Sequence, residues 1–432
     1  MNIFWWFFPL VVMLLLLVIK VPVAYAIIFP SLIYFMFGQE YAPAEMMVQK
    51  MVTTTETFTY LAVPFFIFAS VVFNYAGITR RLMDLANLVV GHLKGGLAHV
   101  NILLSMMMGG LSGSSLADAA QDCKLLVPQM ERLGYSKGFS AVVTATSATI
   151  TPIIPPGIIL IMYATGTNTS IQQIFMAGWI PGLLMTAALM VITVIISHKR
   201  NYRGSRTHMA SIREILDNLK ESIFALLVPV GLIVGLRGGM FTATEGGAIL
   251  AFYALVVGIF VYKEIKLSDM IPILKETLES TVPIMFLLAA AQALGRYLTW
   301  ESLPQMISNA LVDTFTTPVA FIIAVNVVLL IIGCFFDGGA AMVLCAPLLA
   351  PAAAALGIDL VHFGIIMSIN LTIGGVTPPF GTLMFVSCQM TNTPMEEFIK
   401  ELLPFLAMLL VSLFLCSFVP EIVLWLPSIT AA

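Results

Sequence analysis

The chain has 432 residues, of which 59% are hydrophobic and only 10% are charged, and its mean hydropathy is +1.00. A water-soluble fold would carry about 25% charged residues and could not hide so much apolar surface. The net charge of −3 offers no basic face, so no nucleic-acid partner is expected. The composition therefore predicts an all-α polytopic protein in a lipid membrane, in which apolar side chains can face outward as well as inward.

The first apolar segment, residues 4–19, precedes Ala24-Tyr25-Ala26, which has the form of a signal-peptidase site. No basic residue precedes the segment and Lys20 follows it, the reverse of a signal peptide, so we predict a retained first span. A crossing helix needs ~20 apolar residues, allowing for tilt. Ten segments qualify, at roughly 4–19, 22–38, 59–76, 138–165, 171–197, 222–237, 242–262, 281–298, 359–389 and 396–428.

Two further apolar regions, 96–134 and 300–357, are broken in the middle by glycine-rich peptide. The breaks lie at 109–115 and 333–339. Each half is short for a full crossing, which favours two re-entrant helical hairpins that enter and leave on the same side. A pair of ordinary spans in each region is the alternative.

The sequence also repeats itself, because residues 110–185 align without a gap on residues 333–408. Chance predicts about 0.4 coincident prolines between such windows, so the four observed indicate an internal duplication. The four prolines of the first copy that fall on prolines of the second are Pro128, Pro155, Pro156 and Pro181.

Each repeat holds five predicted crossings and one hairpin, and an odd number of crossings inverts the second copy. Lys94, Arg132 and Lys137 flank the first hairpin, whereas no Lys or Arg occurs between residues 297 and 399. The positive-inside rule then opens the first hairpin to the cytoplasm and the second to the outside, with both termini outside.

We therefore divide the chain into a first repeat (1–197), a cytoplasmic linker (198–221) and a second, inverted repeat (222–432). The stretches 39–58 and 263–280 mix polar and apolar residues at equivalent positions. They are expected to be interfacial arm helices, with plain loops as the alternative.

Inverted repeats with helices broken near the membrane midplane are typical of ion-coupled secondary transporters. Carbonyls at the ends of half-helices suit a hard cation such as Na⁺, and half-helix N-termini favour an anion. Pairing each hairpin tip with a broken helix gives two predicted Na⁺ sites, and close packing of small residues is the alternative explanation. Their candidate ligands are Ser112, Ser114, Ser115, Thr149 and Thr151 in the first, and Gly333, Asp337, Thr372, Gly375 and Thr377 in the second.

Two acidic residues lie within or beside the hairpin breaks and a third lies at the entrance of a span, and an intramembrane charge is a functional hypothesis by default. Asp337 is the preferred candidate for a cation or substrate site. Asp118 either contributes to a site or caps the second helix of its hairpin, and Glu245 is expected to begin a helix near the interface.

Several other functions find less support. Gly110-Leu111-Ser112-Gly113 matches a rhomboid intramembrane serine protease motif, for which His362 is the only plausible partner. The position equivalent to Ser112 in the repeat is Phe335, which argues against this reading. No nucleotide-binding or zinc-protease motif appears, and the five cysteines lack a C-x-x-C pair, so no catalytic or metal site is predicted. A stand-alone anion transporter or a channel remains an alternative.

Five further motifs stand out in the chain: Ser112–Ala120, Leu125–Pro128, Thr151–Pro156, Phe241–Glu245 and Gly374–Gly381. Together they resemble the large membrane subunit of TRAP (tripartite ATP-independent periplasmic) transporters, over about residue 20 to the last span. The chain departs from the commoner pattern at Gln121-Asp122-Cys123, where small residues are usual, and at Gly157.

This resemblance implies an elevator-type, Na⁺-driven importer of organic acids in the bacterial inner membrane. It also implies a separate four-helix small membrane subunit and a periplasmic substrate-binding protein. The substrate would be a small carboxylate, such as sialic acid or a C4-dicarboxylate, held between the hairpin tips. The residues expected near it are Ser115, Pro155, Asp337, Gly338, Thr377 and Pro378.

Overall fold

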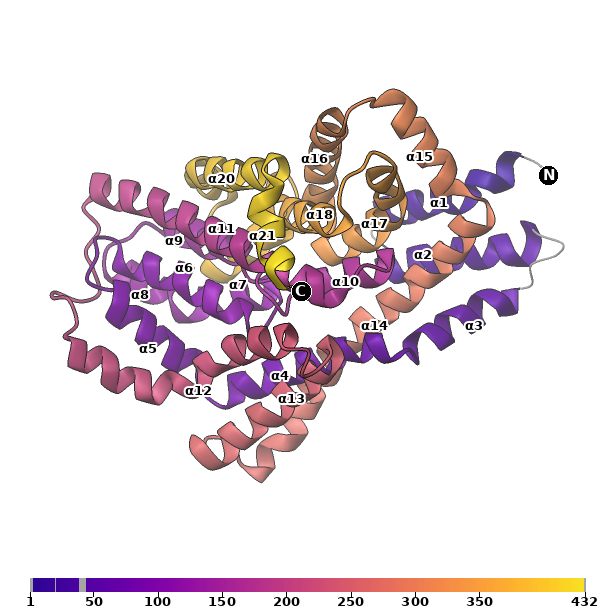
Figure 1. Cartoon of the computed structure of the whole chain (residues 1–432). Helices are drawn as coiled ribbons and strands as arrows, with labels where there is room; N and C mark the ends of the chain where they lie inside the picture. Colours follow the sequence, from indigo (N-terminus) through magenta and orange to yellow (C-terminus); the bar gives the residue numbers. More distant parts are fainter. Residues whose placement is uncertain (1–2, 20, 39–43, 431–432) are drawn as a thin grey trace.

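The computed structural model describes residues 3–19, 21–38 and 44–430, so Lys20 and the beginning of the predicted arm at 39–58 lie outside the described residues. Within these ranges all regular elements are helices and no strand occurs, which confirms the all-α class (Figure 1). Eight described helices are long and apolar enough to cross a membrane, fewer than the ten predicted spans.

The first half of the chain begins with two apolar helices and ends with the longest helix of that half. Its elements are α1 (Ile3–Val18), α2 (Val23–Ile33), α3 (Ala44–Thr55), α4 (Ala62–Tyr75), α5 (Ile78–Val90), α6 (Gly96–Gly109), α7 (Ser115–Leu125), α8 (Val127–Arg132), α9 (Lys137–Ser147), α10 (Ile158–Thr167) and α11 (Ile171–Arg200).

The second half follows a similar order. Its elements are α12 (Ile212–Arg237), α13 (Ala243–Val256), α14 (Met270–Trp300), α15 (Leu303–Thr314), α16 (Pro318–Phe335), α17 (Gly338–Ala355), α18 (Leu360–Gly374), α19 (Thr382–Thr391), α20 (Met395–Phe418) and α21 (Pro420–Thr430).

The predicted broken helices at 138–165 and 359–389 are each two short helices in the structure. The breaks after α9 and after α18 both contain adjacent prolines, and a proline cannot donate the backbone hydrogen bond that would continue a helix. Both pairs then end on an asparagine in the left-handed conformation, Asn168 (φ 56°) and Asn392 (φ 50°), which suits a helix C-terminus. The last predicted span, 396–428, is likewise divided, at Val419.

The second hairpin begins later than residue 300. α15 is a separate helix, and the hairpin consists of α16 and α17 with the break at Phe336–Asp337. The sequence between α15 and α16 is polar, Thr317 caps α16 through its hydroxyl, and Pro318 occupies the first helical turn, a favourable position for proline. Apolar composition alone could not reveal this boundary.

The helices form two groups, which we call the scaffold group and the hairpin group. In the scaffold group α14 packs along α2, α3 and α4, and α4 packs against α13 (Figure 1). The predicted arm at 263–280 is continuous with the following span, because α14 runs unbroken from Met270 to Trp300. The hairpin group comprises α6–α11 and α16–α21, in which α7 packs on α19 and α10 on α17.

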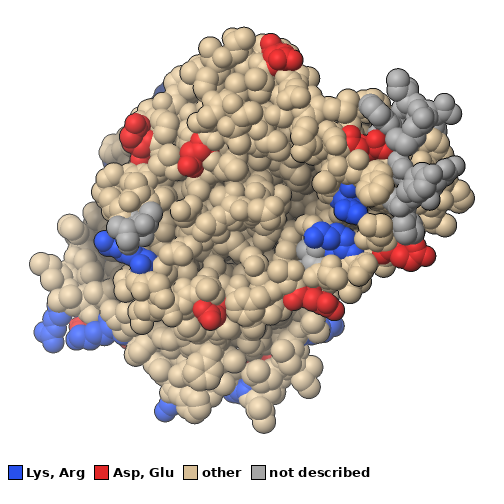
Figure 2. Space-filling view, turned by 45° about the vertical axis from the view of Figure 1, so that its right-hand side comes forward, with Lys and Arg blue, Asp and Glu red and all other residues tan. Residues whose placement is uncertain are grey.

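The outer surface fits a membrane environment. Figure 2 shows broad areas without Lys, Arg, Asp or Glu between small groups of charged residues. Large apolar side chains are exposed on several of the long helices, including Val234, Phe252 and Phe414, which are 58%, 71% and 62% exposed. Such surface is tolerable in lipid or against a partner but not in water.

Candidate functional site

The tips of the two hairpins meet at one cavity of about 240 Å³. The first hairpin contributes Gly113–Leu116 and the second contributes Asp337–Gly339. The breaks after α9 and α18 complete the wall through residues such as Pro152 and Gly375, and Ile284 of α14 adds a scaffold residue. Segments far apart in the chain thus converge on one place, which we call the tip cavity.

Four helices begin at the wall of the tip cavity. The first residues of α7, α10, α17 and α19 are Ser115, Ile158, Gly338 and Thr382, and all four line it. The N-terminus of a helix carries unpaired N–H groups and roughly half a positive charge. An arrangement of four such ends around one small cavity favours an anion.

Glycines allow the backbone to approach closely at both tips. Gly113 has φ +59°, and a Cβ there would lie 2.4 Å from the carbonyl oxygen of Pro156. The carbonyl of Gly113 accepts a hydrogen bond from the N–H of Ile158, at 3.4 Å, so this tip is attached to the break beside it. Gly333 of the second hairpin packs backbone to backbone against Gly374 at the end of α18.

The candidate ligands of the first Na⁺ site do not share one environment. Ser114 caps α7 by accepting from the N–H of Ala117 at 3.4 Å, and it lines the tip cavity together with Ser115. Ser112 has a buried hydroxyl without a hydrogen-bond partner. Thr149 lies in the turn after α9 and donates to the carbonyl of Thr146 near the end of that helix, at 2.6 Å.

Thr151 points away from the tip cavity, into the first hairpin. Its hydroxyl lies 2.8 Å from Oδ2 of Asp118 and 3.2 Å from the carbonyl oxygen of Ser105. Asp118 is therefore not the cap of α7, because Ser114 holds that position and Asp118 lies one turn further along. Glu245 does begin its helix, in a capping box with Thr242, as the sequence predicts.

The candidate ligands of the second Na⁺ site lie closer to the tip cavity. Asp337, Thr372 and Gly375 line it, with Asp337 capping α17 through a hydrogen bond from the N–H of Gly339 at 3.0 Å. Gly333 is buried against Gly374. Thr377 lies in the break after α18 and donates to the carbonyl of Ile373 near the end of that helix, at 2.8 Å. These assignments stay predictions.

Of the residues expected near a substrate, Ser115, Asp337 and Gly338 line the tip cavity, whereas Pro155, Thr377 and Pro378 do not. Met162, Ile284 and Thr382 were not predicted and also line it. Thr382 begins the helix that follows the second proline break, so the repeat could have indicated it. Ile284 lies in the other helix group, and only the tertiary structure brings it here.

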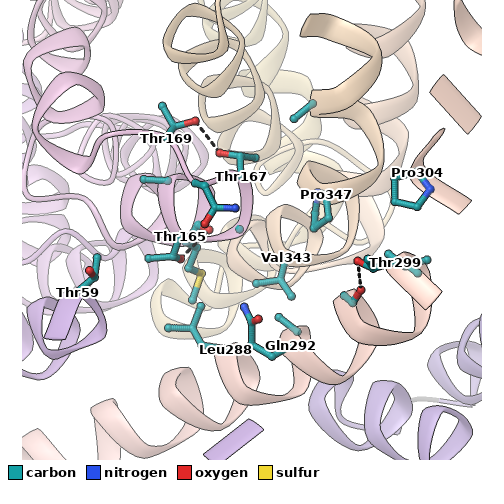
Figure 3. Close-up of a pocket in the computed structure, with 18 of the residues that line it drawn as sticks. Thr59, Thr165, Thr167, Thr169, Leu288, Gln292, Thr299, Pro304, Val343 and Pro347 are labelled. Carbon is teal, nitrogen blue, oxygen red and sulfur yellow. Dashed lines mark hydrogen bonds between the residues drawn. The ribbon is translucent and has the colours of Figure 1, made fainter. Parts of the chain in front are cut away.

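A larger cavity of about 900 Å³, which we call the vestibule, lies between the two helix groups (Figure 3). Gln292 and Leu288 of α14 face Val343 and Pro347 of α17 across it, and Thr167 and Thr169 hydrogen-bond to each other at 2.8 Å (Figure 3). Its only charged lining residues within the described chain are Lys50 and Arg296, both basic. Met162 lines both cavities, so the vestibule lies next to the tip cavity.

The serine-protease alternative requires a histidine beside Ser112. The structure instead buries His362 in α18, where its Nε2 lies 2.7 Å from the carbonyl oxygen of Cys416. Among the described residues no histidine is hydrogen-bonded to Ser112, whose hydroxyl has no such partner. The geometry gives no support to a catalytic pair.

Comparison with known proteins identifies a family. The family model of the tripartite ATP-independent periplasmic transporter, DctM component, matches residues 10–422. The chain is 37% identical to the sialic acid TRAP transporter large permease protein SiaM of Vibrio cholerae, over 95% of each chain. It is also 37% identical to the C4-dicarboxylate TRAP transporter large permease protein DctM of Pseudomonas aeruginosa, over 88% of each chain.

The fold also resembles a solved structure of a more distant transporter. The crystal structure of the YdaH transporter of Alcanivorax borkumensis matches with a TM-score of 0.67 at 12% sequence identity. The match covers 95% of this chain and 98% of that one. The two chains therefore share a fold.

Proposed function

The chain belongs to the DctM-component family of TRAP transporters and is a large permease rather than an enzyme, and from this premise we propose that it imports a small organic acid anion driven by Na⁺. The observation that supports an anionic substrate is the convergence of the N-termini of α7, α10, α17 and α19 on the tip cavity. A carboxylate there would meet backbone N–H groups and the hydroxyls of Ser114, Ser115 and Thr382. Sialic acid and C4-dicarboxylates are the candidate substrates, because they are the ones that the names of two relatives print.

Cation coupling follows from charge balance. Moving an anion into a cell with a negative interior costs about 2.3 kcal/mol per charge for each 100 mV, so cations must accompany it. The ends of α6 and α16 lie beside the breaks after α9 and α18, where backbone carbonyls come close together. The two predicted sites at these places would supply at least two Na⁺.

An elevator motion fits the division into two helix groups. The hairpin group carries both tips and would slide against the scaffold group, taking the substrate with it. The vestibule lies between the groups and borders the tip cavity at Met162, so it provides a route for the substrate. Its basic residues, Lys50 and Arg296, would favour entry of an anion.

The proposed assembly has three components. A four-helix small membrane subunit would cover part of the exposed apolar surface, and a periplasmic substrate-binding protein would deliver the anion to the vestibule. The chain would lie in the bacterial inner membrane with both termini in the periplasm, which places the base of the second hairpin and the vestibule on that side.

The test is uptake of labelled sialic acid and C4-dicarboxylates into proteoliposomes that hold both membrane subunits, with the binding protein outside. An inward Na⁺ gradient should drive uptake. Ser115→Ala and Asp337→Ala should each lower the initial rate about tenfold or more, the expected effect of losing a hydrogen bond to a charged group.

Two exposed residues provide matched controls. Ser268→Ala and Asp313→Ala make the same chemical changes at exposed positions outside the tip cavity, and their uptake should equal that of the wild type. Uptake that ignores the Na⁺ gradient would exclude Na⁺ coupling and favour passive conduction or another ion. If Ser115→Ala and Asp337→Ala both keep the wild-type rate of Na⁺-driven uptake, the transport site does not lie at the tip cavity.

A further inference from the structure

The helix that follows the first tip buries two carboxyl groups. Asp118 is 2% exposed and Asp122 is fully buried. They lie four residues apart on α7 and therefore on the same face of the helix, where two negative charges repel each other. Among the described residues no Lys or Arg forms an ion pair with either of them.

Most of the oxygens of this acidic pair have no hydrogen-bond partner. Asp118 accepts through Oδ2 from the hydroxyl of Thr151, at 2.8 Å. Oδ1 of Asp118 and both carboxyl oxygens of Asp122 are buried without a hydrogen bond. Buried polar atoms nearly always have a hydrogen-bond partner in folded proteins, so three carboxyl oxygens without one in the same place require an explanation.

A third side chain points to the same place from a different helix. Ser105 of α6 is fully buried, and its hydroxyl faces the Asp118 carboxyl without forming a hydrogen bond of normal geometry. The backbone carbonyl of Ser105 lies 3.2 Å from Oγ1 of Thr151. Oxygens from α6, α7 and the break after α9 thus surround Asp118.

Residues of α19 lie on another side of this acidic pair. Cys123 adjoins Asp122 in the chain, and it faces Ser387 and Cys388 of α19. Ser387 is itself fully buried with no hydrogen-bond partner, and α19 contains no charged residue. An ionised carboxylate is strongly unfavourable in such a place unless an opposite charge joins it.

We propose that Asp118 and Asp122, together with the hydroxyl of Ser105, form a buried Na⁺ site inside the first hairpin. Their carboxylate and hydroxyl oxygens, which have no hydrogen-bond partner, are the hard ligands that such a cation prefers. Neither carboxyl lines the tip cavity, so this site is separate from the one proposed for the substrate.

The site deepens the proposed Na⁺ coupling and rests on that function for its role, whereas the binding of the ion can be measured without transport. Ca²⁺ and Mg²⁺ are less suitable, because Ca²⁺ takes six to eight oxygens and Mg²⁺ keeps several waters. The four unmet side-chain oxygens at this site are fewer, and no bulk solvent reaches them.

The test measures equilibrium binding of ²²Na⁺ to the purified complex of the large and small subunits in detergent. Asp122→Asn keeps the size of the side chain and removes a buried charge, so it should fold, and it should bind about one Na⁺ fewer per chain than the wild type. Asp217→Asn makes the same change at an exposed position and should bind as the wild type does. Ser105→Ala should weaken binding at the same site about tenfold while leaving the number of ions unchanged at high Na⁺.

Two results would overturn the site. One is an Asp122→Asn variant that binds as many Na⁺ ions as the wild type with the same affinity. The other is displacement of the Asp122-dependent ion by equimolar Ca²⁺ or Mg²⁺, which would make the site divalent.

Uptake assays on the same preparations separate this inference from the proposed function. If Asp122→Asn binds Na⁺ as the wild type does, while uptake by the wild type is driven by Na⁺, the proposed site is wrong and the proposed transport function stands. If Asp122→Asn binds one Na⁺ fewer, while uptake by the wild type does not depend on Na⁺, the proposed Na⁺ coupling is wrong and the proposed binding site stands.

Discussion

At the scale of single residues, the second hairpin depends on a close backbone contact between Gly333 and Gly374. A Cβ on Gly374 would lie 2.5 Å from the Cα and 2.6 Å from the carbonyl carbon of Gly333. Backbone atoms cannot rotate aside as a flexible side chain can, so the helices α16 and α18 would have to separate. The contact joins the hairpin to the broken helix that borders the tip cavity.

We expect Gly374→Ala to lower the free energy of unfolding by about 1–3 kcal/mol, as overpacking typically does. The midpoint of thermal unfolding of the purified complex in detergent measures it. Gly295→Ala is the matched control, because Gly295 also lies within a helix and a Cβ there meets nothing within 4 Å. The control should be neutral or slightly stabilising, by up to about 1 kcal/mol. Equal destabilisation by both variants would refute the role of the contact.

At the scale of elements, each half of the chain helps to hold the other. Glu397, in the first turn of α20, accepts a hydrogen bond from the N–H of Gly138 at 2.9 Å, in the first turn of α9. At the far end of α11, Arg200 pairs with Glu401 of the same helix α20, at 2.8 Å. α20 therefore ties the beginning of α9 and the end of α11 together, and a carboxylate at the N-terminus of α9 is electrostatically favourable.

Glu397→Ala should lower the free energy of unfolding by about 1–2 kcal/mol, because it removes a charge-assisted hydrogen bond from the start of α9. Hydrogen exchange at the amides of residues 138–141 should become faster in the same variant. Glu396→Ala is the control, since Glu396 lies in the same turn of α20 and is exposed. A comparable effect of both changes on α9 would show that the link contributes nothing.

At the scale of the whole molecule, the vestibule is formed by helices from both groups and combines Lys50 of α3 with Arg296 of α14. Two positive charges at one entrance raise the local concentration of an anion. Dissolved salt screens this attraction at distances beyond about 8–10 Å. The charges lie on elements distant in sequence, so neither repeat alone would produce this field.

The double variant Lys50→Gln, Arg296→Gln should raise KM for the anionic substrate about threefold to tenfold at low salt, with a smaller change in kcat. The difference from the wild type should shrink as KCl is added. Lys275→Gln, on the exposed side of α14 and outside the vestibule, is the control and should keep the wild-type KM. A KM that is unchanged in the double variant at low salt would exclude electrostatic attraction at the vestibule.

Much of this architecture was predictable because membrane helices follow simple rules of length and polarity. The low charge content excluded a soluble fold. Glycine-rich peptide marked the hairpin breaks at residues 109–115 and 333–339, and adjacent prolines at 155–156 and 378–379 marked the two broken helices, since a proline cannot continue the backbone hydrogen bonds of a helix. The family followed from motifs around these breaks. The start of the second hairpin at Pro318 was not predicted, because only the short segment 315–317 separates α15 from α16, and the cap that Thr317 provides to α16 defines the boundary.

The sequence by itself determined the all-α class, the membrane environment, the family and the segments that carry the site, since these depend on composition and local backbone chemistry. Only the tertiary structure decided which ligands meet. It directed Thr151 toward Asp118 rather than the tip cavity, brought the N-termini of four helices together, and added Ile284 from the scaffold group. The physical reason is that the direction of a side chain at a helix break depends on how the broken ends pack against other helices, and no local pattern encodes that packing.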